Sequence, residues 1–195
     1  AKEITLDKNF KNKNIYLHLE RTRLTRVWVN DVEVGCRDSL TTPHHYDLTP
    51  YIKYGQENVI AVRIDNDWNY KERATGTKYQ WSNKNFNANY GGIPKNVWLH
   101  VTDRLYQTLP LYSNLKTTGV YIYAEDIRVK SRKAIIHAES EIRNEYNRDK
   151  QVSYQVELID RDGTSIQTFE GTKAVVKPGE TITLKAASEV DNLHF

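Results

Sequence analysis

Two pairs of carboxylates in this sequence are spaced so that they could support acid–base chemistry. Asp65 with Asp67, and Glu139 with Glu141, each stand two residues apart, and paired carboxyl groups are a common source of a general acid and a general base. However, residues two apart in a β-strand share a face by default, and exposed faces are commonly acidic. We therefore expect neither pair to be catalytic and assign no catalytic residue to this chain.

Histidines and acidic residues could also hold a metal ion. His44 and His45 are adjacent, and neighbouring side chains of a strand or loop normally diverge, so we expect surface or turn histidines and no metal site. Asp65-Asn66-Asp67 begins like a calcium loop, but Tyr70 stands where such a loop needs glycine and Gly76 where it needs glutamate. The EF-hand interpretation fails, a structural calcium of another type stays open, and no cofactor is expected.

The stretch from Asp65 to Tyr90 interleaves aromatic residues with asparagines. Aromatic rings pack on the apolar face of a pyranose while amides hydrogen-bond its hydroxyl groups, so this mixture suits a sugar. Our candidate carbohydrate-binding residues are Trp68, Asn85, Asn87 and Tyr90. The alternative is structural, because asparagines favour turns and a tryptophan near Gly91-Gly92 can plug a sandwich or face a neighbouring domain.

The elements that must position these residues are short strands. Ile15, Leu17 and Leu19 alternate with polar or aromatic residues, and this period of two predicts strands with one buried face. Turn signals separate the runs, namely Asn30-Asp31, Asp162-Gly163 and residues 177–180 (KPGE). No segment shows a long helical period, so we predict an all-β protein.

The composition of the chain argues against two kinds of partner, nucleic acids and membranes. Its 195 residues suit two domains, 38% are hydrophobic and 27% charged, and the net charge of +3 is spread along the sequence. Because there is no dense run of lysine and arginine and no long apolar segment, we expect neither a nucleic-acid partner nor membrane insertion.

Three linked motifs carry a resemblance to a known family. They are residues 26–35 (RVWVNDVEVG); residues 46–52 (YDLTPYI) followed by Gly55 and residues 58–66 (NVIAVRIDN); and residues 90–99 (YGGIPKNVWL). Their order and spacing resemble the sugar-binding jelly-roll of family 2 glycoside hydrolases, the group of β-galactosidases, β-glucuronidases and β-mannosidases. Asp31 stands where the family usually has glycine, and Lys95 where it commonly has arginine.

The resemblance implies a galactose-binding-like jelly-roll followed by an immunoglobulin-like sandwich. We expect the jelly-roll over residues 1–107, a linker over 108–118 and the immunoglobulin-like domain over 119–195, with the first incomplete at its start and the second at its end. The family carries its two catalytic glutamates on a (β/α)₈ barrel that follows these domains, and no alternating strand and helix pattern is present here.

The resemblance therefore implies a non-catalytic fragment of a retaining exo-β-glycosidase, inactive alone. Its partners would be a β-linked glycoside and the catalytic barrel of the same polypeptide, in the periplasm or outside the cell by family analogy. In the family, the region matching residues 65–90 lies toward the active-site mouth. Two alternatives stay open: a free-standing carbohydrate-binding module, which would bind sugar alone, and an immunoglobulin-like adhesion module, which would bind a protein and ignore sugars.

Overall fold

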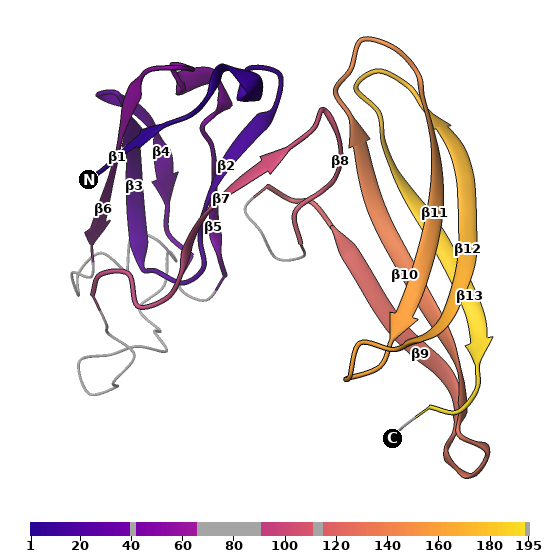
Figure 1. The fold of residues 1–195 in the computed structure, drawn as a ribbon. Coiled ribbons are helices and arrows are strands. Elements are labelled where there is room, and N and C mark those ends of the chain that lie inside the picture. The colour runs from indigo at the N-terminus through magenta and orange to yellow at the C-terminus, as the bar shows by residue number, and fades with distance from the viewer. Residues whose placement is uncertain (40–41, 66–90, 111–114, 194–195) are drawn as a thin grey trace. The chain divides into compact units, whose positions relative to one another are not determined.

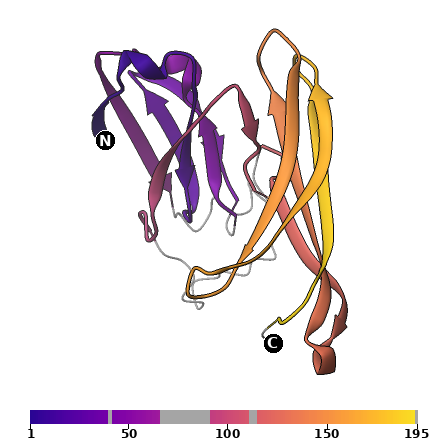
Figure 2. The ribbon, with the colours of Figure 1, turned by 45° about the vertical axis from the view of Figure 1, so that its right-hand side comes forward.

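The computed structural model describes residues 1–39, 42–65, 91–110 and 115–193. The chain divides into two compact units, Ala1–Asp103 with Tyr112–Leu115, and Arg104–Leu111 with Lys116–Phe195. Both units are built from strands (Figure 1 and, turned, Figure 2), and the helical segments among the described residues are three-residue 3₁₀ turns. The predicted all-β class is confirmed.

The first unit is a sandwich of two antiparallel sheets. One sheet has the order β1-β6-β3-β4 and the other β5-β2-β7. Its strands are β1 (Lys2–Thr5), β2 (Asn14–Leu19), β3 (Leu24–Val29), β4 (Val32–Arg37), β5 (His44–Asp47), β6 (Glu57–Asp65) and β7 (Val97–Thr102).

The core between these sheets follows from the alternation in the sequence. Ile15, Leu17 and Leu19 of β2 face Val27 and Val29 of β3 across a cluster of buried apolar residues. Each side chain in this row is at most 2% exposed, and full burial of such a residue contributes about 1.5–3 kcal/mol. The hydrophobic row is therefore the principal reason that the two sheets stay together.

The turn between β3 and β4 has the conformation that its residues suggest. Asn30 and Asp31 both adopt positive φ, at 48° and 67°, as a two-residue type I′ hairpin turn requires. Asparagine and aspartate tolerate this region better than other residues with a β-carbon. The predicted hairpin is confirmed, and the aspartate in place of glycine does not disturb it.

A buried asparagine, Asn58, holds the turn that precedes β6 in place. Asn58 is fully buried, and its Oδ1 accepts hydrogen bonds from the Lys53 backbone N–H at 2.7 Å and from Asn30 Nδ2 at 2.9 Å. Its Nδ2 donates to the carbonyls of Lys53 and Gln56, at 2.9 and 3.0 Å. One side chain thus closes the turn before β6 and ties it to the β3–β4 hairpin.

The second unit also has two layers. β10 pairs with β13, β9 and β8 in one sheet, and β11 pairs with β12 in a second. The strands are β8 (Leu105–Gln107), β9 (Val120–Arg128), β10 (Lys133–Asn144), β11 (Lys150–Ile159), β12 (Ser165–Val176) and β13 (Thr181–Val190). The turns predicted at Asp162-Gly163 and at residues 177–180 lie between β11 and β12 and between β12 and β13.

Gly171 and Thr172 join the two layers where β12 approaches β13. A β-carbon on Gly171 would stand 2.4 Å from the Lys185 carbonyl oxygen and 2.7 Å from Ala186 Cβ. The Thr172 hydroxyl donates to that same carbonyl at 3.0 Å and accepts from the Lys185 N–H at 3.1 Å. Glycine is needed here for close approach, and the threonine satisfies backbone groups where the strands meet.

The segment expected to be a linker is tied at both described ends to one carboxylate. The Thr108 hydroxyl donates to Glu141 Oε1 at 2.8 Å, and the Thr118 N–H donates to the same oxygen at 3.1 Å. β8, which precedes this segment, pairs with β10 in the second unit. The division at residues 107/108 and 118/119 stays a prediction.

Candidate functional site

The four candidate sugar-binding residues, Trp68, Asn85, Asn87 and Tyr90, lie outside the described residues. The strands that flank them are described, and they end at one edge of the first unit. Asp65 at the end of β6 pairs with Leu24 at the start of β3, and Val97 at the start of β7 pairs with Leu19 at the end of β2. We call this edge the loop end, and its described connections are residues 20–23, 38–39, 42–43 and 91–96.

His44 braces two connections of the loop end. It is fully buried on β5, and because a carbonyl can only accept, its Nε2–H donates to Ser39 O at 2.8 Å. Its Nδ1 then accepts from the hydroxyls of Thr25 and Thr22, at 2.6 and 3.2 Å. Burial lowers the pKa of His44. A neutral imidazole therefore connects the β2–β3 turn to the β4–β5 loop.

A buried tyrosine continues this network into the core. Because the Thr25 hydroxyl donates to His44, the Tyr46 hydroxyl donates to the Thr25 hydroxyl oxygen at 2.6 Å, and it also lies 3.1 Å from the Thr25 carbonyl oxygen. Burial raises the pKa of Tyr46 to about 12. The Arg37 guanidinium lies over the tyrosine ring, 5.3 Å from its centroid. The base of the loop end is thus fixed by hydrogen bonds before any ligand binds.

Three further histidines gather on the opposite face of the β5-β2-β7 sheet. His45 Nε2 lies 2.8 Å from His18 Nδ1, and their rings meet edge to face at 4.5 Å. The His100 ring centroid is 5.1 Å from that of His18. Burial, and then the charges of the neighbouring histidines, lower the pKa of His45 to about 4, and burial, followed by His100, lowers the pKa of His18. The imidazoles of His18 and His45 are therefore neutral near pH 7.

The prediction that His44 and His45 are surface or turn residues is wrong. Both belong to β5 and both are 0% exposed. The antiparallel register places His45 opposite His18 and Tyr16 opposite His100. These pairs are far apart in the sequence, so they could not be predicted from adjacent residues. Within the described ranges, no group of three or more His, Cys, Asp or Glu is arranged to hold a metal ion.

The candidate carboxylates of the second unit are engaged in structural contacts. Lys185 Nζ donates to Glu139 at 2.8 Å. Although burial of Glu141 acts to raise its pKa, the hydrogen bonds from Thr108 and Thr118 outweigh burial and lower that pKa. A general acid needs a raised pKa, so the surroundings of Glu141 oppose that role. In the first unit, Arg63 pairs with Asp65 at 3.3 Å, and Asp67 lies outside the described residues.

An apolar groove opens beside the first strand of the first unit. It has a volume of about 410 Å³ and runs between β1, β6 and β7. Its lining includes Leu17, Ile60, Ile93, Val97 and Trp98, and the Trp98 side chain is 53% exposed. Such a lining can pack against an apolar surface, including the C–H face of a sugar ring, but it supplies no acid–base pair.

Across the described parts of the chain, no helix has both the length and the apolar character needed to cross a membrane.

Comparison with known proteins gives relatives that match nearly all, or about half, of the chain. A β-glucuronidase from Formosa agariphila is 34% identical over 192 residues, which is 98% of this chain and 19% of that protein. A β-galactosidase from Thermoanaerobacter pseudethanolicus is 34% identical over 102 residues, 51% of this chain and 13% of that protein. The chain thus spans about a fifth or less of the length of these two relatives.

Comparison with solved structures gives the same result as comparison of sequences. The structure of a β-glucuronidase from glycoside hydrolase family 2 superposes with a TM-score of 0.87 at 31% identity, covering 100% of this chain and 20% of that one. Residues 111–192 also match a family described as a protein of unknown function, DUF1425. This chain belongs to glycoside hydrolase family 2, in which it corresponds to the N-terminal β domains.

Proposed function

We propose that this chain is a non-catalytic part of a larger β-glycosidase, where it shapes the substrate cleft and supports the catalytic barrel. The observation that carries the proposal is the match of the whole chain to about a fifth of a β-glucuronidase. Relatives named β-glucuronidase and β-galactosidase both occur, so the proposed substrate class is a β-linked glycoside.

The contacts of the carboxylates support placing the chemistry elsewhere. Glu139 is paired with Lys185, and Glu141 accepts hydrogen bonds from two threonines. A glycosidase needs one carboxyl group with a raised pKa and a second ionised carboxylate on the other side of the bond that is cleaved. Neither Glu139 nor Glu141 is placed in this way.

The loop end is the part of the chain that we propose lies nearest the substrate. Trp68, Asn85, Asn87 and Tyr90 belong to the connection between β6 and β7, which starts and finishes at this end. The His44 hydrogen bonds hold the neighbouring connections in place. A preorganised base lowers the entropy lost when a few side chains contact a sugar. We therefore propose a supporting role for these four residues.

Titration calorimetry of the isolated chain with glucuronate, galactose and mannose tests this function. A wall of the cleft contributes only a few of the contacts to the sugar, so we expect dissociation constants in the millimolar range or weaker. Trp68→Ala should abolish any heat that is observed, whereas Asn9→Ala, an exposed residue of the first 3₁₀ turn, should not change it. Micromolar binding would contradict the proposal.

The apolar groove supports a second candidate, a free-standing carbohydrate-binding module. Trp98 is the exposed aromatic residue of that groove and could stack on a pyranose. In that case the isolated chain would bind a sugar in the micromolar range, and Trp98→Ala rather than Trp68→Ala would remove the binding. The same titration therefore distinguishes the two functions.

A further inference from the structure

Arg37 is a half-buried cation without an acidic partner. It is the last residue of β4 and pairs with Thr25, so it stands directly before the 38–39 connection of the loop end. Its Nη1 donates to the Cys36 carbonyl at 2.9 Å, while its Nε is buried and has no hydrogen-bond acceptor. Among the described residues, the adjacent Asp38 included, no carboxylate forms an ion pair with Arg37. A buried N–H group without an acceptor is rare and costly, so packing alone does not explain this arginine.

Other arginines of the chain have acidic partners. Carboxylates lie within 3.5 Å of the guanidinium groups of Arg26, Arg63, Arg128 and Arg143. The acids close to the loop end are also engaged, because Asp65 pairs with Arg63 and Glu20 accepts a hydrogen bond from Asn96 Nδ2 at 3.0 Å. The unbalanced charge is therefore a particular property of Arg37.

The guanidinium of Arg37 is held in one orientation. It lies over the Tyr46 ring, 5.3 Å from the ring centroid. Tyr46 is 1% exposed, and its hydroxyl is bonded to Thr25, so the ring is itself fixed. Stacking on this ring and the hydrogen bond to the Cys36 carbonyl leave the Arg37 side chain few conformations. A guanidinium that is ordered in advance loses little entropy when it binds an anion.

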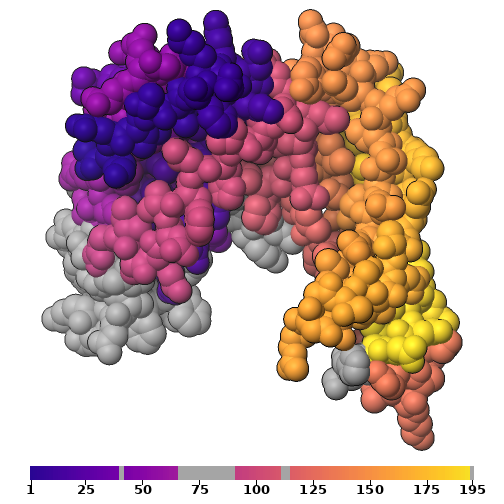
Figure 3. All heavy atoms as spheres, in the orientation of Figure 1, coloured from indigo at the N-terminus to yellow at the C-terminus, as the bar shows by residue number. Residues whose placement is uncertain are grey.

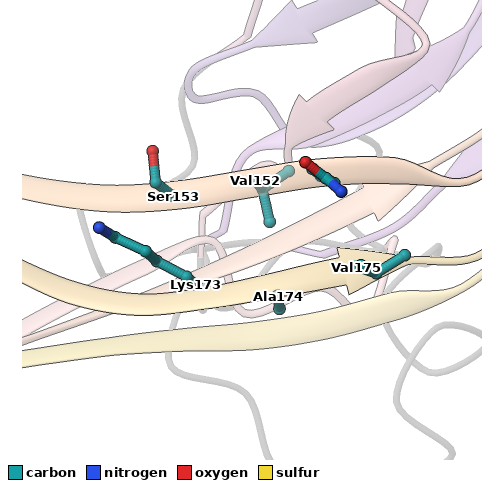
Figure 4. A pocket seen from close by; sticks show the side chains of 6 residues that line it. Val152, Ser153, Lys173, Ala174 and Val175 are labelled. Atoms are coloured by element: carbon teal, nitrogen blue, oxygen red, sulfur yellow. The ribbon is translucent and has the colours of Figure 1, made fainter.

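A cation also borders a hollow of the second unit, but its charge is balanced. β11 and β12, drawn in orange in the space-filling view, form much of the near surface of that unit (Figure 3). A hollow of about 490 Å³ lies over these paired strands, and Lys173 is among its lining residues (Figure 4). Lys173 Nζ lies 3.0 Å from the Glu170 carboxylate. Arg37 is therefore the better candidate for binding an anion.

The charge around Arg37 also favours an anionic ligand. Over the described connections of the loop end together with Arg37, the cations Arg21, Arg23, Arg37 and Lys95 outnumber the acids Glu20 and Asp38. An excess of positive charge attracts anions. The Nη2 group of Arg37 is not among its buried atoms, so a ligand can reach it. Guanidinium N–H groups match the two oxygens of a carboxylate in spacing and in plane.

We propose that Arg37 binds the carboxylate of a uronic acid in the substrate glycan, so that the loop end favours an acidic sugar over a neutral one. This inference rests on the proposed function, which places the loop end beside the substrate. Relatives named β-glucuronidase and β-galactosidase both match this chain, and a glucuronide carries at C6 the carboxylate that a galactoside lacks. Arg37 contacts a group that does not react, so its role is in specificity and not in catalysis.

The test compares two sugars that differ only at C6. Methyl β-D-glucuronide has a carboxylate there, and methyl β-D-glucoside has a hydroxymethyl group. Each sugar is titrated into the isotope-labelled chain at the same sodium concentration, and its dissociation constant is obtained from the amide chemical shifts near Arg37. We expect the dissociation constant of the glucuronide to be about fivefold lower, as one charge-assisted contact that water partly screens would give.

Two variants on neighbouring strands provide the control. Arg37→Gln removes the charge and should bring the two dissociation constants together. Arg26→Gln removes an exposed arginine that is paired with Glu33, and it should leave their ratio unchanged. The comparison of the two sugars in the unaltered chain needs no variant, so it decides the question even if Arg37→Gln does not fold.

Several results would overturn the inference. They are equal dissociation constants for the two sugars, no binding of the glucuronide, and an unchanged ratio in folded Arg37→Gln. Equal shifts with sodium acetate at the same concentration would also overturn it, because the site would then bind any carboxylate without the sugar. The proposed function is compatible with weak or absent binding and is contradicted instead by micromolar affinity, so the two failures are distinguishable.

Discussion

Replacement of Asn58 by alanine should strongly destabilise the first unit. The side chain is fully buried and makes four hydrogen bonds of 2.7–3.0 Å, to Lys53 N, Lys53 O, Gln56 O and Asn30 Nδ2. Each contributes about 1 kcal/mol net, and the groups left behind are unsatisfied. We therefore expect Asn58→Ala to lower the free energy of unfolding by about 3–4 kcal/mol.

Urea unfolding followed by tryptophan fluorescence measures this loss. With a slope of about 1–2 kcal/mol/M, the midpoint of the transition of the first unit should fall by roughly 2 M. Asn9→Ala, at an exposed position, should change the free energy by less than about 0.5 kcal/mol. A loss below about 1 kcal/mol for Asn58→Ala would refute the reasoning.

The variant Asn58→Asp, which has nearly the same shape, distinguishes the contribution of the hydrogen bonds to stability from that of burial. Asn58→Asp keeps an acceptor for Lys53 N but turns a carboxylate oxygen toward the carbonyls of Lys53 and Gln56. This raises the pKa of the new carboxyl group in the folded state, so its protonated form is favoured there. The variant should thus be closer to the parent in stability at pH 4 than at pH 7. Equal losses at both pH values would contradict this account.

Two further perturbations concern the histidines and the junction of β12 with β13. The pKa of His45 in the folded state, about 4, lies below its ordinary value of 6.5. The contribution of neutral His45 to the free energy of unfolding is therefore complete above pH 6.5 and is lost as the pH falls toward 4. His45→Gln should make the free energy of unfolding from urea titrations depend less on pH in this range, and an unchanged pH profile would count against the buried histidine cluster. Gly171→Val should cost about 2–3 kcal/mol, because its β-carbon would lie 2.4 Å from the Lys185 oxygen. At Gly163 a β-carbon would have nothing within 4 Å, and the φ is 89°, so Gly163→Ala should lower the free energy of unfolding by about 1 kcal/mol through backbone strain alone. Equal decreases in the calorimetric melting temperature for the two variants would argue against close packing between β12 and β13.

The strands and turns could be predicted from the sequence because they depend on local rules. The alternation of Ile15, Leu17 and Leu19 marks the buried face of β2, and Asn30-Asp31 specifies a turn with positive φ. The resemblance to family 2 also includes Asn58, whose side-chain amide donates to the nearby carbonyls of Lys53 and Gln56.

The histidine contacts could not be predicted because they depend on register between distant strands. His18 alternates with leucines and looks like an exposed polar residue, yet it meets His45 across a strand pair separated by 27 residues. Alternation tells which residues share a face but not whether a polar face is covered. For the candidate site, the sequence indicates four residues that stay predictions, namely Trp68, Asn85, Asn87 and Tyr90. The structure adds the loop end, where the connection that contains them starts and finishes and where the hydrogen bonds of His44 hold other connections in place.

We propose that this chain supports glycoside hydrolysis without performing it. Release of nitrophenol from a panel of aryl β-glycosides, including the glucuronide and the galactoside, tests this claim most directly when the pure chain is the only protein present. We expect no release above the buffer rate. Release that disappears when Glu139 or Glu141 is changed to glutamine would contradict it.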